Sequence, residues 1–441
     1  MEKDRERQPY MVQRRNEPSA LSDIRVLDLS GEAGMYCGKL LADLGADVIK
    51  IEPPGGDPAR HVGPFYHDEA DVEKSLSFFY LNTSKRGVTL NLQLSDSREL
   101  FRRLVRTADV VVESFPPGYL DGLGLGYQGL CQIRPDIILT SVTGFGQWGP
   151  HAHYKAPDIV GVAMSGVMWL AGYVDDPPNL PYGNQGYLSA SIQAAAGTLM
   201  ALYHRDLTGE GQQVDVSMQE ALSIAQETAM QTWDMNRAVR CREGASRLGL
   251  VVPGIGPYQC KDGWVFSYIG TPGGATWSEL LDWMIEEGAA EDLVEEPHRS
   301  LAENINMPFI TGLLLDLGSA VEKLQNLQHV DEVLRRFFAA RNKWYVYEEG
   351  QRRRLLIGIV STPKDLAENR QLAFREFFQG VHHPELNDTL RYPGPPVRLA
   401  ETPWRMRRRP PLVGEHNEEI YCGELGLPPE EVALLHARGA I

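Results

Sequence analysis

Apolar residues in the first part of the chain follow two alternating patterns, one typical of strands and one typical of helices. Residues 24–29 form a short apolar run rich in strand-forming side chains, and a polar turn follows at 30–34. Leucines then recur at helical spacing as far as Gly45, and residues 47–52 form a second apolar run. This order predicts a strand, a crossover helix and a parallel strand, which together make one βαβ unit. Because ligands gather where parallel strands end, the turn at 30–34 is a candidate anion site at the start of the helix.

The same alternation continues to about residue 145. Strand-like runs at 88–92, 108–115 and 136–145 are separated by a helical stretch at 92–106 and by turns that contain glycine and proline. Strands that alternate with helices in this way predict an α/β fold with a doubly wound, largely parallel sheet.

The later part of the chain changes in composition and predicts a second domain. We expect a flexible arm at 1–20, a large domain at 21–235, a linker at 236–250, a small domain at 251–375 and a return segment at 376–441. The small domain begins with a predicted hairpin whose turn is Lys-Asp-Gly, and helical stretches follow it. The return segment is rich in proline, which disfavours helix, so we expect it to run back and complete the large domain.

The charge balance narrows the choice of partners. A formal net charge of −16 argues against nucleic acid or an anionic membrane as a partner, although a local pocket can still hold an anionic cofactor. The five cysteines show no metal-ligand or redox-pair spacing, which is typical of a reduced, cytoplasmic protein. The first 20 residues contain no apolar signal core, and the longest uncharged stretch, 159–174, is broken by glycines, so we expect no membrane span.

Three common catalytic or cofactor patterns are missing from the sequence. Gly31, Gly34 and Gly38 do not form G-x-G-x-x-G, so a nicotinamide-nucleotide site is disfavoured. The eleven histidines show neither H-x-x-x-H nor H-E-x-x-H spacing, so we expect no metal site. The lack of G-x-S-x-G argues against a Ser-His-Asp hydrolase.

A group of basic residues lies close to the predicted strand ends. Lys50 lies within the second apolar strand, and Arg60, Lys85 and Arg86 lie in neighbouring loops. Solvated surface charge is the ordinary explanation for such residues. A polyphosphate ligand is the alternative, because clustered lysine and arginine attract phosphate.

Six stretches of the chain carry a resemblance to one known family. They are LLADLGADVIKIEPPGGD, NTSKRGVTLNL, ADVVVESFPPG, SVTGFGQWGP, TGEGQQVDVSMQEA and PLVGEH, in this order. With these stretches the chain resembles the family III CoA-transferases, the group of formyl-CoA transferase, carnitine CoA-transferase and α-methylacyl-CoA racemase. The stretches span most of the chain in the family's order, which makes the resemblance specific.

The resemblance implies a fold and a substrate. A Rossmann-like large domain would be built from both chain ends, a small α+β domain would join it, and two subunits would interlock as a dimer. Coenzyme A, delivered as an acyl-CoA, would lie on the large domain with its thioester near Glu32 and Ala33, and no metal is implied. The positions that match the family's coenzyme A site are Lys50, Leu81, Lys85, Arg86, Ser114 and Phe115. Pro53 and Gly122 stand where some relatives carry arginine, which leaves the phosphate contacts open.

The resemblance also identifies a missing residue. In relatives an aspartate opens the helix before the TG-x-GQ turn, attacks the CoA thioester and then carries CoA as a thioester. Tyr187 occupies that position here, and no Asp or Glu occurs between Asn179 and Arg205. Asp158 is the nearest acid upstream. We expect it to cap a helix, with a role as substitute nucleophile as the alternative.

These features predict a CoA-transferase subunit without its usual nucleophile. The chain resembles the Asp-lacking subunit of benzylsuccinate CoA-transferase from anaerobic toluene degradation. That resemblance implies transfer of CoA from succinyl-CoA to a carboxylic acid such as an aryl-succinate, with an Asp-bearing homologous subunit as partner in a heteromer. The aromatic residues Trp169, Tyr173, Tyr182 and Tyr187 suit an aryl group, although core packing is the commoner role of such residues.

Two alternatives stay open. One is an active homodimer that uses Asp158 as nucleophile, and the other is a non-catalytic CoA-binding or assembly protein. An acyl-CoA racemase is disfavoured, because it would also need the missing aspartate for proton transfer.

Overall fold

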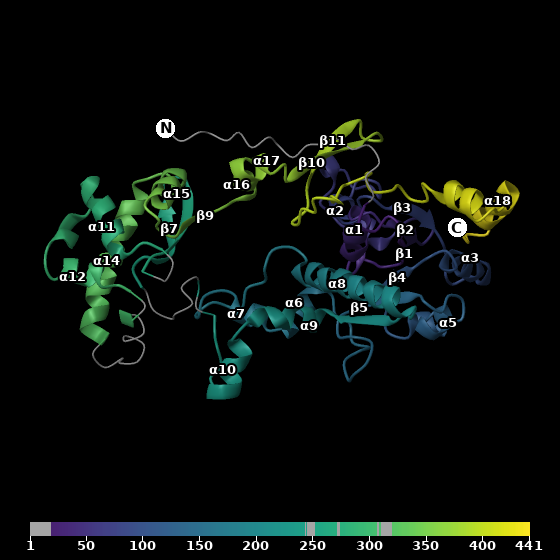
Figure 1. Ribbon diagram of the computed structural model, residues 1–441, viewed down its shortest axis with the longest axis horizontal. Coiled ribbons are helices and arrows are strands. Elements are labelled where there is room, and N and C mark those ends of the chain that lie inside the picture. Colours follow the sequence, from purple (N-terminus) through teal and green to yellow (C-terminus); the bar gives the residue numbers. More distant parts are fainter. Residues whose placement is uncertain (1–18, 243, 245–251, 271–273, 307, 310–319) are drawn as a thin grey trace. The chain divides into compact units, whose positions relative to one another are not determined.

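The chain forms two units in a computed structural model (Figure 1). The structure describes residues 19–242, 244, 252–270, 274–306, 308–309 and 320–441. The large unit contains the chain up to Val167, the segment Leu180–Gln231 and the C-terminal segment Phe374–Ile441. The small unit contains Met168–Asn179 and Thr232–Ala373.

A six-stranded sheet forms the centre of the large unit. Its strand order is β3-β2-β1-β4-β5-β6, and every neighbouring pair is parallel. The strands are β1 (Arg25–Asp28), β2 (Asp47–Glu52), β3 (Arg86–Thr89), β4 (Val110–Glu113), β5 (Ile138–Thr143) and β6 (Gln213–Ser217). The order reverses between β1 and β4, which is the switch point where sheets of this kind bind ligands. The prediction of an α/β fold with a doubly wound parallel sheet is confirmed.

Helices connect and cover these strands. Those of the large unit are α1 (Met35–Asp43), α2 (Leu76–Leu81), α3 (Ser95–Val105), α4 (Tyr119–Gly122), α5 (Tyr127–Cys131), α6 (Asp158–Met164), α8 (Gln185–Thr208), α9 (Met218–Ser223) and α18 (Pro429–Ala437). Shorter turns of helix are η1 (Pro58–His61), η2 (Tyr66–Asp68), η3 (Ile224–Gln226) and the π-helical η5 (Glu418–Glu424). The chain passes from one unit to the other within α7 (Val167–Leu170), within α10 (Ala229–Asn236) and within α17 (Arg370–Phe374), and also between Asn179 and Leu180.

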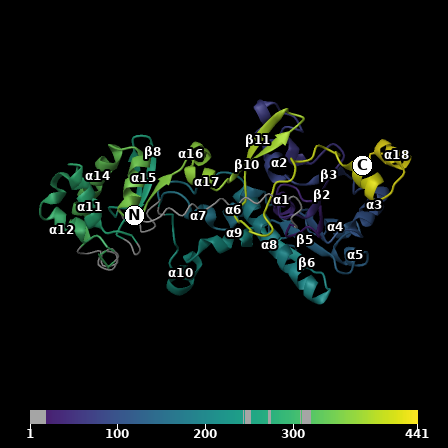
Figure 2. The same cartoon turned by 45° about the horizontal axis from the view of Figure 1, so that its top comes forward.

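The 24-residue helix α8 carries small residues on its buried face. Gly186, Ala190, Ala194 and Thr198 follow one another at intervals of four residues and are all buried. Small side chains let a helix approach its neighbours closely, and α8 contacts α1 and β5. Both views show α8 alongside β5 (Figures 1 and 2). The close approach brings the start of α8 to the turn that follows β1.

The C-terminal segment completes the large unit. It begins with the hairpin of β10 (Phe378–His383) and β11 (Asp388–Pro393), and then runs beside β3, where the His416 N–H donates to the Gly87 carbonyl at 2.9 Å. Tyr421 and Leu435 are buried in the same apolar cluster as Leu27 of β1. Figure 1 shows the C-terminal helix α18 beside α3. A large unit made from both chain ends is therefore confirmed.

The small unit combines a sheet with helices around its own core. Its antiparallel strands are β7 (Ile255–Cys260), β8 (Gly263–Tyr268) and β9 (Ile357–Val360), in the order β7-β8-β9. Its helices are η4 (Glu291–Val294), α11 (Trp277–Glu286), α12 (His298–Glu303), α14 (Ala320–Ala339), α15 (Lys343–Arg352), α16 (Pro363–Ala367) and, at its edge, α17 (Arg370–Phe374). Trp277, Trp283 and Phe337 are buried in its core. The predicted hairpin is the pair β7–β8, and the prediction of a small α+β domain is confirmed.

Some predictions fall on residues that the structure does not describe. The arm at 1–20 lies outside the described residues as far as residue 18, and the linker at 236–250 lies outside them at 243 and at 245–250. Among the helices of the described ranges, none has both the length and the apolar character needed to cross a membrane.

Candidate active site

A cavity of about 510 Å³ opens where β1, β2, β3 and β4 end. Its walls come from residues that end or follow these neighbouring strands. They are Leu29, Gly31, Glu32, Ile51, Glu52, Pro53, Asp57, Pro58, Ala59, Val62, Leu90, Asn91, Leu92, Gln93, Ser114, Phe115, Pro116 and Tyr119. Three of the predicted site residues, Glu32, Ser114 and Phe115, therefore line one cavity at the switch point of the sheet.

The turn after β1 is fixed by the strand ends on either side of it. Asp28, the last residue of β1, is fully buried and accepts the Ser30 N–H at 3.0 Å and the Ser30 hydroxyl at 2.5 Å. The Gly31 N–H donates to Ser114 Oγ at 2.9 Å, which ties the turn to the end of β4. These contacts hold Glu32 at the cavity wall.

Glu32 is a half-buried carboxyl group without a basic partner among the described residues. Burial raises its pKa above the usual value, and the nearby charges of Asp57 and Asp158 raise it further. The Glu32 carboxyl therefore takes up a proton more readily than an exposed glutamate.

The start of α8 meets this turn. The Tyr187 N–H donates to Asp158 Oδ1 at 3.0 Å, and the Ser191 hydroxyl donates to the Ala33 carbonyl at 2.8 Å. Burial raises the pKa of the Tyr187 phenol, and the charges of Glu32 and Asp158 act in the same direction. The structure thus gathers Glu32, Ala33, Asp158 and Tyr187 at one corner of the large unit. Asp158 is the first residue of α6. Its carboxylate also caps α8 by accepting the Tyr187 N–H.

Lys50 and Lys85 are buried in ion pairs rather than exposed at the cavity. Lys50 Nζ lies 3.2 Å from Asp57 Oδ2 and also donates to the Ser30 carbonyl. Burial alone would lower the pKa of Lys50, but the charges of Asp57 and Asp28 outweigh it and raise the pKa. Lys85 Nζ donates to Asp28 Oδ2 at 2.7 Å, and both side chains are fully buried. Neither lysine is among the residues that line the cavity.

Leu81 and Arg86 also lie away from the cavity lining. Leu81 ends α2 and packs with Met35 in a separate apolar cluster. Arg86 opens β3, and its guanidinium binds Asp47 and Glu419, with Glu424 as a third partner. The starts of parallel strands meet at the sheet edge opposite their ends, so Arg86 lies across the sheet from the cavity.

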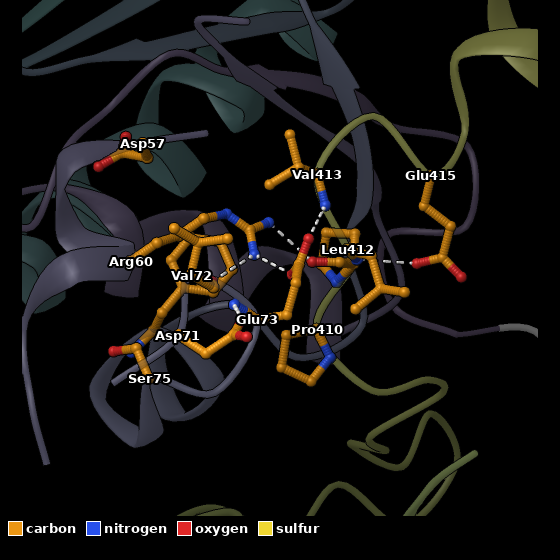
Figure 3. A network of polar contacts seen from close by, with 12 residues as sticks. Asp57, Arg60, Asp71, Val72, Glu73, Ser75, Pro410, Leu412, Val413 and Glu415 are labelled. Carbon is orange, nitrogen blue, oxygen red and sulfur yellow. Dashed lines mark hydrogen bonds and ion pairs between the residues drawn. The ribbon is translucent and has the colours of Figure 1, made fainter. Parts of the chain in front are cut away.

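Arg60 joins the cavity wall to the C-terminal segment. Its guanidinium donates to both oxygens of Glu52, at 2.7 and 2.8 Å, and to Glu73 Oε2 at 2.7 Å. Its Nη2 also donates to the Pro411 carbonyl at 2.8 Å, and Glu73 accepts the Val413 N–H at 2.8 Å. Figure 3 shows Arg60 and Glu73 facing the segment that carries Leu412 and Val413. Arg60 is 1% exposed and is not among the residues that line the cavity, so this candidate phosphate-binding residue is held behind the wall in ion pairs.

Sequence reasoning missed Glu113, a buried carboxyl group that lines a separate, smaller cavity of about 110 Å³ together with Ser141 and Gln147. Glu113 ends β4, is 5% exposed, and accepts the Phe115 N–H at 2.7 Å. Burial raises its pKa to about 7, because the opposing hydrogen bonds from Ser141 and Phe115 do not compensate for lost hydration. The available signal was an acid placed at the end of the otherwise apolar run 108–115.

The comparison with protein families shows which family the chain belongs to. The model of CoA-transferase family III matches residues 21–417 of the chain. The chain belongs to CoA-transferase family III. The family prediction made from the six sequence stretches is confirmed.

This family III chain is similar to CoA-transferases over nearly its whole length. It is 36% identical to the succinyl-CoA:(R)-benzylsuccinate CoA-transferase subunit BbsE of Thauera aromatica, over 95% of this chain and 98% of BbsE. It is 32% identical to the formyl-CoA:oxalate CoA-transferase of Streptomyces coelicolor, over 96% of this chain and 99% of that enzyme. CoA-transferases use acyl-CoA as substrate, and nothing in these matches points to a metal cofactor.

A solved structure supports the fold of the family III chain. The crystal structure of a CaiB/BaiF family protein from Brucella suis covers 92% of this chain and 99% of its own, with a TM-score of 0.77. At 24% sequence identity this likeness concerns the fold alone.

One cluster of potential metal ligands lies in the small unit of the family III chain. Asp292 accepts from His329 Nε2 at 2.9 Å, and its other contact, His298 Nδ1, lies at 3.2 Å. Side-chain hydrogen bonding to His329 lowers the pKa of Asp292, so these contacts act as a hydrogen-bonded link among η4, α12 and α14. Sequence spacing gave no sign of the cluster, because its members come from three separate elements.

Proposed function

We propose that this chain is a subunit of a CoA-transferase that moves CoA from an acyl-CoA, such as succinyl-CoA, to a carboxylic acid such as an aryl-succinate. In this proposal a homologous partner subunit supplies the nucleophilic aspartate. The observation that carries it is the side chain at position 187. Tyr187 lies at the third residue of α8, beside the cavity turn, where the family's aspartate is expected. A phenol does not form the acyl anhydride through which a carboxylate accepts the acyl group.

The transfer then follows carboxylate chemistry on the partner. The partner's aspartate attacks the thioester carbonyl and forms a mixed anhydride, and the CoA thiolate leaves. The thiolate attacks the aspartyl carbonyl, which releases the first acid and leaves an aspartyl-CoA thioester. The acceptor acid repeats the two steps in reverse and leaves as the new acyl-CoA. Backbone N–H groups at a helix start stabilise the oxyanions that form.

An exposed apolar face on α8 supports a partner subunit. Ile192, Met200, Tyr203 and Leu207 are 49%, 68%, 68% and 69% exposed. Their spacing places them within one sector of the helix surface. Monomeric proteins rarely leave such faces uncovered, and the relative BbsE is itself named as a subunit.

The cavity and the relatives support the choice of substrates. Glu32, Ser114 and Phe115 would form the wall against which coenzyme A lies, with Ala33 next to it in the turn after β1. (R)-Benzylsuccinate and oxalate, the acids in the relatives' names, are both dicarboxylic acids. We therefore assign a dicarboxylic acid, with an aryl substituent, as the acceptor.

One contact favours a second candidate, an active homodimer that uses Asp158. The Asp158 carboxylate lies at the start of α8, 3.0 Å from the Tyr187 nitrogen, and is thus close to the position of the family's aspartate. It is 8% exposed and already caps the helix, so it would have to leave this contact before it could attack a thioester.

Trapping the CoA adduct tests the proposal. The protein purified with its partner is incubated with succinyl-CoA, digested, and examined by mass spectrometry for a peptide that carries CoA. We expect the adduct on an aspartate of the partner and none on this chain. An adduct on Asp158 would overturn the proposal in favour of the homodimer.

A substitution sharpens the same test. Tyr187→Asp is expected to give this chain its own CoA adduct. Tyr154→Asp, at a tyrosine that is 65% exposed and lies outside α8, serves as the control and should give none. A Tyr187→Asp chain that folds but forms no adduct would contradict the simple loss of a nucleophile.

A further inference from the structure

The small unit contains a buried arginine whose charge is matched by no carboxylate among the described residues. Arg242 is 9% exposed. Its Nε donates to the carbonyls of Tyr173 and Asp176, both at 2.9 Å, and its Nη2 reaches the Val174 carbonyl at 3.5 Å. Its Nη1 is buried and has no hydrogen-bond partner in the described structure.

The surroundings of Arg242 hold its guanidinium in one orientation. Segment 168–179 folds over it, and the Gly244 N–H donates to the Gly172 carbonyl at 2.9 Å. Gly244 has a φ of +65°, and a Cβ there would lie 2.6 Å from the Tyr173 ring, so glycine is needed at this close approach. Trp169 Nε1 donates to the Arg240 carbonyl at 2.7 Å and closes the same fold.

A buried guanidinium that has no carboxylate partner is stabilised when it binds an anion. Backbone carbonyls offset part of the cost of burying the charge, but they supply no negative charge. The free Nη1 is a donor with a fixed direction. A carboxylate is the group that best matches it, because charge-assisted hydrogen bonds to arginine are short and strong.

Aromatic side chains next to the guanidinium indicate what the carboxylate is attached to. The Arg242 guanidinium carbon lies 5.3 Å from the centre of the Trp169 ring. Trp169 is 45% exposed and Tyr173 is 59% exposed, so the guanidinium lies one side chain below the surface. Exposed rings beside a cation provide a surface on which an aryl group can stack.

We propose that Arg242, together with Trp169 and Tyr173, binds an aryl dicarboxylate through the carboxylate that does not react. The proposal rests on the proposed function, in which a dicarboxylic acid accepts CoA. Transfer turns one carboxylate of that acid into a thioester, while the second keeps its charge before and after the reaction. An arginine that holds the second carboxylate selects dicarboxylic over monocarboxylic acids.

Hydrogen exchange on the wild-type protein with its partner is the first test. (R)-Benzylsuccinate and 4-phenylbutyrate are compared as ligands, because they differ by one carboxylate. We expect benzylsuccinate to slow exchange in 168–179 and at 240–242, and 4-phenylbutyrate to leave these segments unchanged. Equal effects of both acids, or no slowing there by benzylsuccinate, would overturn the proposal.

Dissociation constants measured by calorimetry provide the second test. Arg242→Gln should raise the constant for benzylsuccinate about 10- to 100-fold, the range that a charge-assisted hydrogen bond contributes. The constant for 4-phenylbutyrate should stay the same. The control is Arg237→Gln, which removes an arginine whose side chain is 68% exposed and should change neither constant. An unchanged constant for benzylsuccinate in Arg242→Gln would contradict the assignment.

Failure of this inference can be told apart from failure of the proposed function. Neither binding measurement needs turnover. If the pair transfers CoA but the two acids behave alike at 168–179, only the Arg242 site is wrong. If benzylsuccinate protects 168–179 but no CoA transfer or adduct is found, the Arg242 site stands as a binding site and the proposed function is wrong.

Discussion

Charged groups of the large unit fall into two sets that behave differently. Lys85 with Asp28, and Arg60 with Glu52, are buried pairs in which every charge has an opposite charge at hydrogen-bond distance. Glu32 and Glu113 are carboxyl groups with no basic partner in the described part of the chain, and burial raises the pKa of each.

This difference separates charges that stabilise the fold from carboxyl groups whose pKa is raised by burial. In the paired set an opposite charge acts against the effect of burial, as the pKa of Asp28 shows. Burial acts to raise that pKa, but Lys85 and Lys50 outweigh it and hold it below the usual value. In the unpaired set no cation opposes desolvation, which raises the pKa of Glu32 and raises the pKa of Glu113 to about 7. We therefore assign the paired residues to the fold, and we propose that Glu32, the unpaired carboxyl group that lines the cavity, takes part in its chemistry.

The largest effect is expected from breaking a buried pair. Lys85→Met removes the ammonium group that donates to the fully buried Asp28, leaves only Lys50 to offset its charge, and should lower the free energy of unfolding by about 3–5 kcal/mol. Urea unfolding followed by circular dichroism measures the change. Lys155→Met, at an exposed position, is the control and should stay within about 0.5 kcal/mol of wild type. A loss below about 1 kcal/mol in Lys85→Met would show that the pair is not structural.

A pH-dependent effect of similar size is expected from Glu113. Its pKa rises from an ordinary 4.5 to about 7 in the folded chain, so the folded state binds more protons than the unfolded state between these values. The stabilisation is therefore complete below pH 4.5 and is lost as the pH rises through 7, by about 3 kcal/mol in total. Glu113→Gln should remove this part of the pH dependence when unfolding is measured from pH 5 to 8. A slope identical to wild type would contradict the assignment.

A smaller effect is expected from the cap on α8. Asp158→Ala leaves the Tyr187 N–H without its acceptor and should lower the free energy of unfolding by about 1–3 kcal/mol. Hydrogen exchange at the start of α8 should become faster. Asp158→Asn keeps an acceptor oxygen and should recover most of the loss, whereas equal losses in both variants would mean that the carboxylate charge, not the hydrogen bond, is what stabilises α8.

The smallest effect is expected from Glu32. Its side chain makes no hydrogen bond or ion pair among the described residues, so Glu32→Gln should change the free energy of unfolding by no more than about 0.5 kcal/mol. Any change at pH 8 should be stabilising, because the substitution removes a charge that burial, Asp57 and Asp158 all disfavour. A loss above 1 kcal/mol, read from the same unfolding curves, would move Glu32 into the structural set.

The sequence predicted the sheet and part of the site. Apolar runs and helical spacing were sufficient for the parallel strands. The resemblance to the family singled out Glu32 and Ser114, which line one cavity in the structure. The sequence could not predict the contacts of the basic residues, because a lysine near a strand end can face a ligand or a buried acid. Lys85 lies 57 positions from Asp28, its partner, and no local sequence pattern indicates such a contact.

Two further features depend on the folded backbone. Arg86 lies in a loop just before an apolar run, and we therefore predicted that it lies close to the ligand. In the structure it opens β3, so it lies at the end of the sheet opposite the cavity. Arg242 lies 66 to 69 positions from the carbonyls that orient it, and its segment has no regular period. Such contacts follow from the fold and are visible only in the structure.

Native mass spectrometry of the protein purified from its source, without overexpression, tests the central claim most directly. The account predicts a one-to-one complex of this chain with a homologous chain that carries an aspartate at the position of Tyr187. Transfer activity should accompany that complex and not this chain alone. A pure homodimer that transfers CoA between acids would contradict the account and would make Asp158 the first residue to examine.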